Sequence, residues 1–168
     1  MVSSLSRRRM LQAIGGSIAI GPWGLNHANA SVAKKEEWNS SIKKGLDYAA
    51  QTQSRLGHWA GGNGQYPTAM TALAGTAMIC SGSTTVQGPF SANVRRATDY
   101  LLSKVRGNGL IGDKSDGHYT YGHGFSMLFL SQVFGEEEDE DRREELVEVL
   151  SQAVEFSVNA QTPSGGWG

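Results

Sequence analysis

The sequence has a single cysteine among its 168 residues, Cys80, so an internal disulfide bond is excluded and stability must come from packing. Cys80 lies in an apolar stretch, where we expect it to be a small core residue. Basic residues are not in surplus, since 15 Lys and Arg stand against 16 Asp and Glu, which argues against a nucleic-acid partner. The sequence also lacks a nucleophile motif such as Gly-x-Ser-x-Gly.

The sequence also lacks long apolar runs, and the apolar run near the N-terminus is short. The apolar run at residues 13–25 contains a proline and several glycines and is shorter than the ~20 residues that a transmembrane helix needs. Adjacent arginines at residues 7–9 precede it, and Ala-Asn-Ala at residues 28–30 follows it as a cleavage site. We therefore predict that residues 1–30 are a twin-arginine signal peptide, that Ser31 begins the mature chain, and that the protein is exported to the periplasm.

The mature chain is acidic. Without the three arginines of the signal, 12 Lys and Arg remain against 16 Asp and Glu, a net charge of −4. Most of the excess lies in the run Glu-Glu-Glu-Asp-Glu-Asp at residues 136–141, which we interpret as a solvated loop followed by the negative first turn of a helix. Contiguous carboxylates cannot all point at one ion without a shaped loop, so this run does not predict a metal site.

A short pattern, Gln-x3-Gly-x-Trp, is repeated along the chain. It occurs twice, at Gln53, Gly57 and Trp59 and at Gln161, Gly165 and Trp167. An aromatic residue precedes each Gln by five positions, and a degenerate copy with the same frame lies between them at Tyr100, Val105, Gly109 and Ile111. Successive copies are 52 residues (53 to 105) and 56 residues (105 to 161) apart, a period typical of stacked helical repeats.

The segments between these patterns predict helices of two kinds. Amphipathic helices with a charged side are expected at residues 36–53, 91–106 and 141–160, the second with Ser91 as N-cap. Helices without any Lys, Arg, Asp or Glu are expected at residues 67–80, opened by Pro67, and at 123–134, closed by Gly135. A helix without a polar face must be enclosed by other elements. The sequence therefore predicts an all-α fold in which uncharged inner helices alternate with charged outer helices.

The repeat element also predicts local roles for its residues. The Gly is expected to end each outer helix in the left-handed conformation. The Gln amide is expected to bond stranded helix-end groups, while the Trp ring packs against a neighbouring unit.

The element Gly45-x2-Tyr48-x4-Gln53-x3-Gly57-x-Trp59 resembles the QW repeat of squalene and oxidosqualene cyclases and the related repeat of protein prenyltransferase β subunits. Residues 66–85 and 118–136 are similar to exported bacterial proteins, numerous in planctomycetes, that are identified as prenyltransferase and squalene oxidase repeat proteins. The resemblance spans essentially the whole mature chain. It implies an α/α toroid, a double ring of inner and outer helices, and is only weakly specific for activity.

The catalytic elements that the resemblance implies do not carry over to this chain. Cyclases that protonate an alkene use Asp-x-Asp-Asp, whereas residues 139–142 read Asp-Glu-Asp-Arg and lie in the predicted surface loop. Prenyltransferase β subunits hold zinc through Asp, Cys and His, and Cys80 has no such partner nearby in the sequence. An aspartate-rich motif of the kind that ionises a diphosphate is not found on a predicted inner helix. The sequence thus requires no cofactor and predicts no metal site.

The segment that leads into the second inner helix carries the remaining candidates. Inner helices of one ring run parallel, so this segment should lie beside the entry to the first inner helix at residues 63–66. Such a mouth, with converging helix N-termini, is suited to bind an anionic or polyhydroxyl ligand or to place a general acid. The alternatives are that both histidines cap helices and bond loop carbonyls, or that they ligate a metal with Asp113 or Asp116, although their spacing fits no standard zinc or non-haem iron pattern. The candidate catalytic residues are His118, Tyr121 and His123, and the candidate ligand-binding residues are Tyr66, Asp116 and Tyr119; Asp113 belongs to the same segment.

About two and a half repeats cannot close the double ring that the resemblance implies. We therefore expect an incomplete ring at residues 31–168, an N-terminal portion of something longer, with apolar residues such as 127–134 facing solvent. Either self-association or a missing C-terminal half would cover them.

Three functions remain open at this stage. The first is an exported enzyme of the terpenoid cyclase and prenyltransferase type that acts on an isoprenoid or another bulky apolar substrate. The second is a non-catalytic module that binds a lipid or a glycan. The third is a structural protein or fragment without activity.

Overall fold

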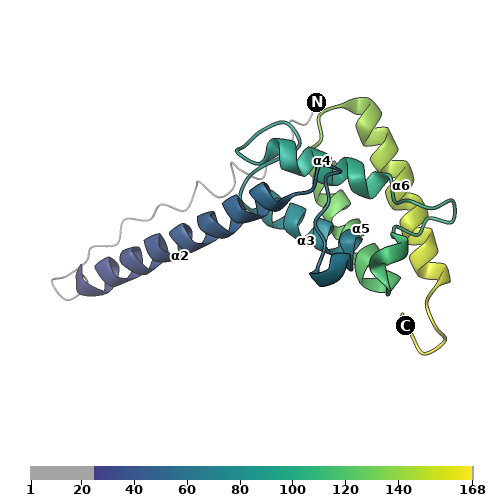
Figure 1. Ribbon diagram of the computed structural model, residues 1–168, viewed down its shortest axis with the longest axis horizontal. Helices are drawn as coiled ribbons and strands as arrows, with labels where there is room; N and C mark the ends of the chain where they lie inside the picture. The colour runs from purple at the N-terminus through teal and green to yellow at the C-terminus, as the bar shows by residue number, and fades with distance from the viewer. Residues whose placement is uncertain (1–24, 168) are drawn as a thin grey trace, which may run out of the picture. The chain divides into compact units, whose positions relative to one another are not determined.

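The computed structural model describes residues 25–167, with side-chain environments from residue 36 onward, and within them the chain is all-α (Figure 1). The α-helices are α2 (Leu25–Thr52), α3 (Pro67–Cys80), α4 (Ser91–Leu102), α5 (Tyr119–Glu136) and α6 (Glu140–Asn159). Two 3-10 helices, η1 (Gly62–Gly64) and η2 (Lys114–Asp116), precede α3 and α5. The chain divides into two compact units, Met1–Ile42 and Lys43–Gly168, and the second contains the packed helices described below.

The predicted signal peptide lies largely outside the described residues, which begin at Leu25. Helix α2 starts there rather than at residue 36, so the expected start of the first helix is wrong. The stretch before residue 36 is rich in Ala and Lys and contains neither Pro nor Gly, a composition with high intrinsic helix propensity. An amphipathic pattern shows where a helix has one apolar and one polar side, and it does not reveal a helical segment without such sides.

Four other expected helix boundaries are also wrong, one of them the end of the second charged helix, which stops at Leu102 rather than at residue 106. Phe90, not Ser91, is the N-cap of α4, and Ser91 is the first helical residue. Gly135 does not end α5, which continues to Glu136, and α5 already begins at Tyr119 rather than at residue 123. Helix α3 begins at Pro67 and ends at Cys80 as predicted, whereas in α5 the side chains mark no start, and the tertiary fold determines where that helix begins.

The two uncharged helices form the centre of the second unit. Helix α3 packs most extensively against α5, and α4 and α6 pack against α3 and α5 respectively. Gly75 makes the α3–α5 contact close, because a Cβ there would lie 2.4 Å from Cε2 of Phe129. Fully buried apolar side chains from α3, α4, α5 and α6 fill the space between the helices: Met78, Val94, Leu101, Phe129, Leu130 and Leu146.

The structure repeats with the register that the sequence predicts. Shifting the first repeat by 52 residues places η1 on η2 and the first residue of α3, Pro67, on the first residue of α5, Tyr119. The same shift equates two buried acceptors: the Trp59 N–H donates to Thr71 Oγ1 at 3.1 Å, and the Ile111 N–H donates to His123 Nδ1 at 3.1 Å. Each charged helix, its turn and the next uncharged helix therefore form one structural unit.

The turn after each charged helix has the same hydrogen bonds in all three copies. The glycine at its centre has a positive φ, of 92° at Gly57, 85° at Gly109 and 86° at Gly165. Its N–H donates to the carbonyl three residues earlier in every copy, at 3.0, 2.8 and 2.8 Å. A second bond runs from Ser54, Arg106 and Thr162 N–H to the carbonyl four residues later. The degenerate middle copy is thus a true member of the repeat.

The Gln and Trp side chains have different tasks from those we expected. Trp59 Nε1–H donates to the Ala49 carbonyl at 2.7 Å, and Trp167 Nε1–H donates to the Ser157 carbonyl at 2.7 Å, so the indole satisfies the helix-end group. The Gln amides instead donate to the carbonyl of the turn glycine, at 2.8 Å from Gln53 and at 2.9 Å from Gln161. The glycine lies in the turn beyond the helix end rather than at the stop itself.

The first two turns press directly against the next charged helix. A Cβ on Gly57 would lie 2.3 Å from the Arg96 carbonyl oxygen of α4, and one on Gly109 would lie 2.3 Å from the Gln152 carbonyl oxygen of α6. Arg96 and Gln152 occupy the same repeat position, since each lies 13 residues before the glycine of its own turn (109 − 96 and 165 − 152). The contact between repeats is therefore itself repeated.

Three side-chain environments differ from those predicted. Within residues 127–134, which we expected to face solvent, Phe129, Leu130 and Val133 are buried and Leu128 is exposed. Cys80 is exposed rather than a core residue, because it lies with Met70, Leu73 and Ala77 on the exposed face of α3. Glu137, placed in the solvated loop by its acidic neighbours, is buried at 5% exposure and accepts a hydrogen bond from Thr85 Oγ1 at 3.0 Å. Charge density along a sequence gives the average exposure of a run and not that of a single member.

None of the described helices is both long enough and apolar enough to cross a membrane.

The glycine contacts give a first prediction. Alanine at position 57, 109 or 165 must adopt a positive φ, which costs roughly 1–2 kcal/mol. At Gly57 and Gly109 the added Cβ also meets a backbone carbonyl, a clash that costs roughly a further 1–3 kcal/mol. A Cβ on Gly165 would meet only Gln161 Nε2, at an ordinary contact distance of 4.0 Å, so this position is the matched control. Urea unfolding followed by circular dichroism should rank Gly165→Ala as the most stable of the three; equal losses would show that the turns do not press on the next helix.

Candidate functional site

The entries to α3 and α5 lie side by side, as the parallel arrangement predicted. Asp116 joins them, because its Oδ1 accepts the Thr68 N–H of α3 at 3.0 Å. The Asp113 N–H donates to Thr68 Oγ1 at 3.2 Å, and the Tyr66 N–H donates to the Ser115 carbonyl at 3.4 Å. Both helix N-termini therefore open at one end of the fold.

The carboxylates of this entry hold the loop together. Asp116 is 1% exposed, and its second oxygen accepts the Asp113 N–H at 2.7 Å. Asp113 pairs with Lys104 Nζ at 2.8 Å and accepts bonds from the Ser115 hydroxyl and N–H. The bonds from Lys104 and Ser115 hold the pKa of Asp113 below its usual range. Both carboxylates are thus committed to bonds within the protein.

Tyr100 lies near enough to Asp113 and Asp116 to be affected by their charges. Burial, with smaller contributions from the negative charges of Asp113 and Asp116, raises the pKa of the Tyr100 phenol to about 12. The phenol therefore stays neutral under ordinary conditions. The Lys104 ammonium lies 4.8 Å from the centre of the same ring.

His123 is a structural residue, and both of its ring nitrogens are occupied. Nδ1 accepts the Ile111 N–H, so the ring proton must be on Nε2, which lies 3.0 Å from Ser157 Oγ and 3.3 Å from the Ala153 carbonyl. Burial lowers the pKa of the imidazole, which favours the neutral form. His123 bonds a loop N–H and does not cap a helix.

The other predicted site residues are spread over the entry. His118 is the N-cap of α5 by backbone position but makes no capping bond with its side chain, and it is exposed. Tyr66 is the N-cap of α3 and has a φ of 54°, a left-handed conformation that is costly for a residue with a side chain. The Tyr119 ring lies under the Arg106 guanidinium at 4.5 Å, and Tyr121 is 61% exposed.

A small apolar cavity lies beside His123, on the side of α6. It has a volume of about 230 Å³ and joins two of the predicted site residues, Tyr119 and His123, with Trp167 of the third turn. Apolar atoms form most of its wall, and the hydroxyls of Thr120 and Ser157 supply polar groups. The remaining lining residues are Leu110, Phe156 and Ala160. The sequence did not predict this cavity, because its wall comes from two parts of the chain, residues 110–123 and 156–167, that are distant in sequence.

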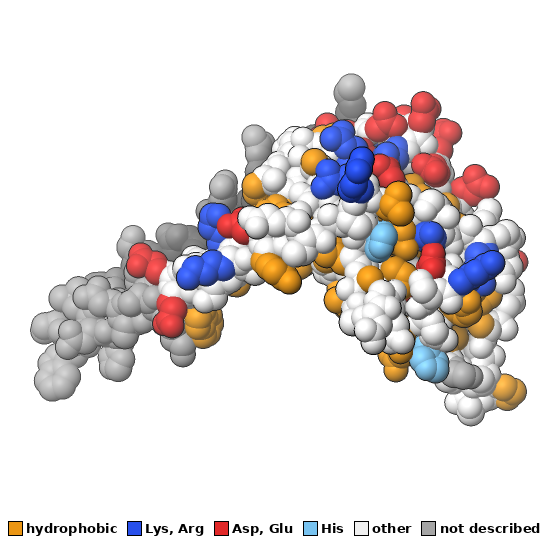
Figure 2. Space-filling view, viewed as in Figure 1, with side chains coloured by type: hydrophobic (Ala, Val, Ile, Leu, Met, Phe, Trp, Pro, Cys, Tyr) orange, Lys and Arg blue, Asp and Glu red, His pale blue; other side chains and the backbone are white. Residues whose placement is uncertain are grey.

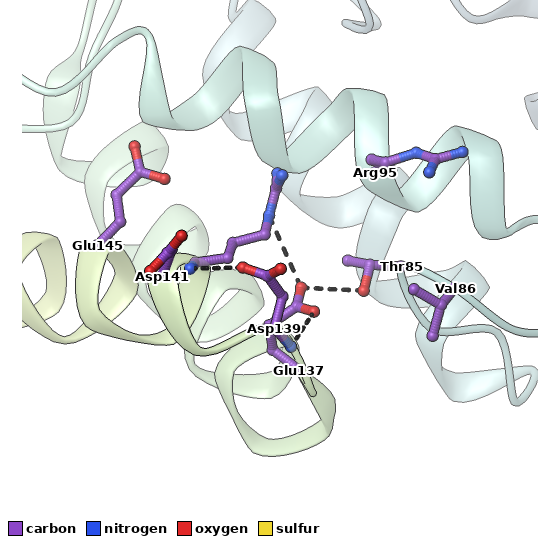
Figure 3. Close-up of a pocket in the computed structure, with 8 residues that line it drawn as sticks. Thr85, Val86, Arg95, Glu137, Asp139, Asp141 and Glu145 are labelled. Atoms are coloured by element: carbon purple, nitrogen blue, oxygen red, sulfur yellow. Dashed lines mark hydrogen bonds and ion pairs between the residues drawn. The ribbon is translucent and has the colours of Figure 1, made fainter.

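A second, polar cavity of about 410 Å³ lies where α6 begins (Figure 3). Figure 2 shows acidic side chains gathered over this part of the molecule. In Figure 3 the Glu137 carboxylate points at Thr85, and the same carboxylate lies 3.7 Å from Arg142 Nε. Asp139 caps α6 by accepting the Arg142 N–H at 2.9 Å. These carboxylates therefore stabilise the junction between α5 and α6.

No group of three His, Cys, Asp or Glu side chains among the described residues is arranged to hold a metal ion.

Comparisons with known proteins assign no family. Neither protein-family models nor curated proteins nor solved structures match this chain. The geometry of the apolar cavity and of the repeat therefore carries the functional argument.

The state of His123 gives a second prediction. Because its pKa is lower in the folded than in the unfolded protein, its contribution to stability is complete above the unfolded pKa of about 6.5 and is lost as the pH falls below it. We expect the free energy of unfolding to decrease from pH 7 to pH 5. His123→Asn keeps an acceptor for the Ile111 N–H, so it should cost roughly 1 kcal/mol at pH 7 and flatten this dependence.

Urea titrations at several pH values measure both the stability lost at pH 7 and the change in the free energy of unfolding with pH. If the His123→Asn variant loses as much stability between pH 7 and pH 5 as the original chain, the interpretation of His123 as a neutral, buried residue is wrong. The ion pair of Asp113 does not interfere, since the low pKa of Asp113 moves its loss to more acidic solutions.

Proposed function

We propose that this protein is an exported repeat protein that binds an apolar small molecule of the isoprenoid or lipid class, with the cavity beside His123 as the site of the hydrocarbon. The observation that supports the proposal is the composition of the cavity wall. Leu110, Phe156 and Trp167 supply apolar surface, while Ser157 and Thr120 supply a few polar groups. Small-molecule sites in proteins commonly combine an apolar wall with a small number of placed polar groups.

The size of the cavity defines what enters it. At about 230 Å³ it is smaller than the roughly 300–1,000 Å³ of sites that enclose a whole drug-sized ligand. It suits the end of a branched hydrocarbon chain, while the rest of the ligand lies along uncharged helix surface. Helix α5 offers such a surface, on which Tyr121 and Leu128 are 61% and 49% exposed.

Binding is a better-supported activity than catalysis. The imidazole of His123 and the carboxylates of Asp113 and Asp116 at the α5 entry each hold backbone, hydroxyl or ammonium groups of the fold, as described above. A catalytic acid or base must exchange a proton with a substrate, and a group with all its bonds committed is poorly placed to do so.

A reaction of the terpenoid cyclase or prenyltransferase type remains the second candidate. It is favoured by the three equivalent turns, which follow the QW-like pattern of Gln, Gly and Trp residues, and by the uncharged helices that they separate. On this proposal the helices belong to an incomplete α/α toroid. The chemistry would then use groups other than the committed residues at the α5 entry.

Ligand binding is tested with farnesol as an isoprenoid probe, and with dodecanol as an unbranched one. Binding should shift the fluorescence of Trp167 and raise the melting temperature with ligand concentration. Ala160→Phe places a ring at the cavity wall and should weaken binding by about tenfold. Val158→Phe adds the same ring at an exposed position that does not line the cavity and is the control.

Equal affinity of the two variants would place the ligand elsewhere, and the absence of binding by the original chain up to the solubility of farnesol would reject the proposed function. Chemical conversion of a bound prenyl substrate, followed by mass spectrometry, would favour the enzymatic candidate instead.

Export is a separate proposal and has its own test. The paired arginines of the N-terminus are what the twin-arginine route recognises. Replacing Arg7 and Arg8 by Lys keeps the charge and should abolish transport of a folded reporter fused to residues 1–35. Replacing Lys34 and Lys35 by Arg is the matched control and should leave transport unchanged. Transport that survives the loss of both arginines would show that the segment is not such a signal.

A further inference from the structure

The contact between successive repeats leaves two surfaces of the second unit uncovered. One, the trailing edge, consists of Gln161, Gly165 and Trp167 in the third turn. The other, the leading edge, consists of Lys44, Gly45 and Tyr48 on α2. The repeat register makes the trailing edge equivalent to the turns that cover α4 and α6, and makes the leading edge equivalent to the surfaces that those turns cover.

The contact between the first turn and α4 shows which bonds form when the two kinds of edge meet. Gln53 Oε1 accepts bonds from Arg96 Nη2 at 2.6 Å and Nε at 3.1 Å. Gly57 lies against the Arg96 backbone, and the ring of His58 stacks on Tyr100 with centroids 4.8 Å apart. The covered surface of α4 thus offers a cation, a small residue and an aromatic ring.

The leading edge offers the same three kinds of residue. In the 52-residue register Lys44 corresponds to Arg96, Gly45 to Ala97, and Tyr48 to Tyr100. Their exposure differs: Ala97 and Tyr100 are 0% and 7% exposed, whereas Tyr48 is 70% exposed and Lys44 and Gly45 are exposed as well. Helix α2 therefore presents a surface of the kind that a turn covers elsewhere in this chain.

The trailing edge is likewise formed and uncovered. The third turn has the internal bonds of the first, including the bond from the Gln161 amide to the Gly165 carbonyl at 2.9 Å. A Cβ on Gly165, however, would meet only Gln161 of its own turn, at 4.0 Å, while a Cβ on Gly57 or Gly109 would meet the next helix. Trp167 is 51% exposed, and its counterpart Trp59 is 9% exposed.

We propose that these edges bind each other between two copies of this chain, so that α2 of one copy lies on the third turn of the next. Continuity with the contact already made twice within the chain carries the inference. Lys44 of one copy then donates to Gln161 Oε1 of the other, in the manner of Arg96 and Gln53. Because Gly45 has no side chain, the third turn of the other copy can approach α2 closely. The Tyr48 ring then covers the apolar surface of that turn.

This association is heterologous, because the two copies contribute different surfaces. Each added copy leaves one leading edge and one trailing edge free, so the product is a row of copies or a closed ring rather than a twofold dimer. The contact joins α2 of one copy to the turn after α6 of the other and does not involve α3 or α5. It differs from association through the apolar faces of α3 and α5, which would not depend on Lys44 or Gln161.

Sedimentation velocity of the full chain over a range of concentrations tests the proposal. The original chain should associate with increasing concentration. Lys44→Glu removes the donor and Gln161→Lys places two cations together, so each should weaken association about tenfold. Lys114→Glu reverses an exposed charge on η2, which belongs to neither edge, and should not change the association. The double variant, with Lys44→Glu and Gln161→Lys in one chain, restores a pair of opposite charges and should associate again.

Mixing the two single variants distinguishes the mode of contact. The leading edge of the Lys44→Glu variant meets the trailing edge of the Gln161→Lys variant with opposite charges, and the other two edges in the mixture are unchanged. A mixture should therefore associate more strongly than either variant alone. Circular dichroism of each variant confirms that it is folded. A chain that stays monomeric at all concentrations, single variants that match Lys114→Glu, or a double variant without recovery would each overturn the proposal.

Discussion

The close approach of a turn glycine to the backbone of the following helix is the constraint on which the rest of this structure depends. At Gly57 and Gly109 any side chain would collide with a carbonyl oxygen of α4 or α6. The positive φ of both residues gives a second, independent reason for glycine. Because the contact sets the distance between successive charged helices, it also sets the space in which the uncharged helices α3 and α5 pack.

The hydrogen bonds around this contact make each repeat a self-contained unit. The Trp indole bonds the end of its own helix, and the Gln amide bonds its own turn. The same bonds form in the third turn although no helix in the described part of the chain covers it. The turn is thus shaped by its own residues, and the following helix binds to a surface that already exists. Stability in such arrays is a sum of unit and neighbour terms, and the neighbour term here is the glycine contact.

The candidate site shows how one side chain can hold the fold together and line a cavity at once. His123 takes the structural position that Thr71 holds one repeat earlier, where it accepts the N–H of the residue after the turn. An imidazole is larger than a hydroxyl and reaches further, to Ser157 of α6. Its ring therefore also forms part of the cavity wall, although both of its nitrogens are committed to the protein.

Periodicity in the sequence by itself determined the all-α class, the repeat register and the conformation of the turn glycines, because these depend on local backbone preference and on the spacing of apolar residues. Only the tertiary structure decided the burial of Glu137, the exposure of Cys80, the exchange of tasks between Gln and Trp, and the cavity beside His123. Each of these depends on which distant segments meet, and spacing along the chain contains no record of distances across it. The assignment of Asp116 and His123 to structural bonds belongs to the same group, since a residue type in a sequence shows what bonds it can make and the fold decides which of them it does make.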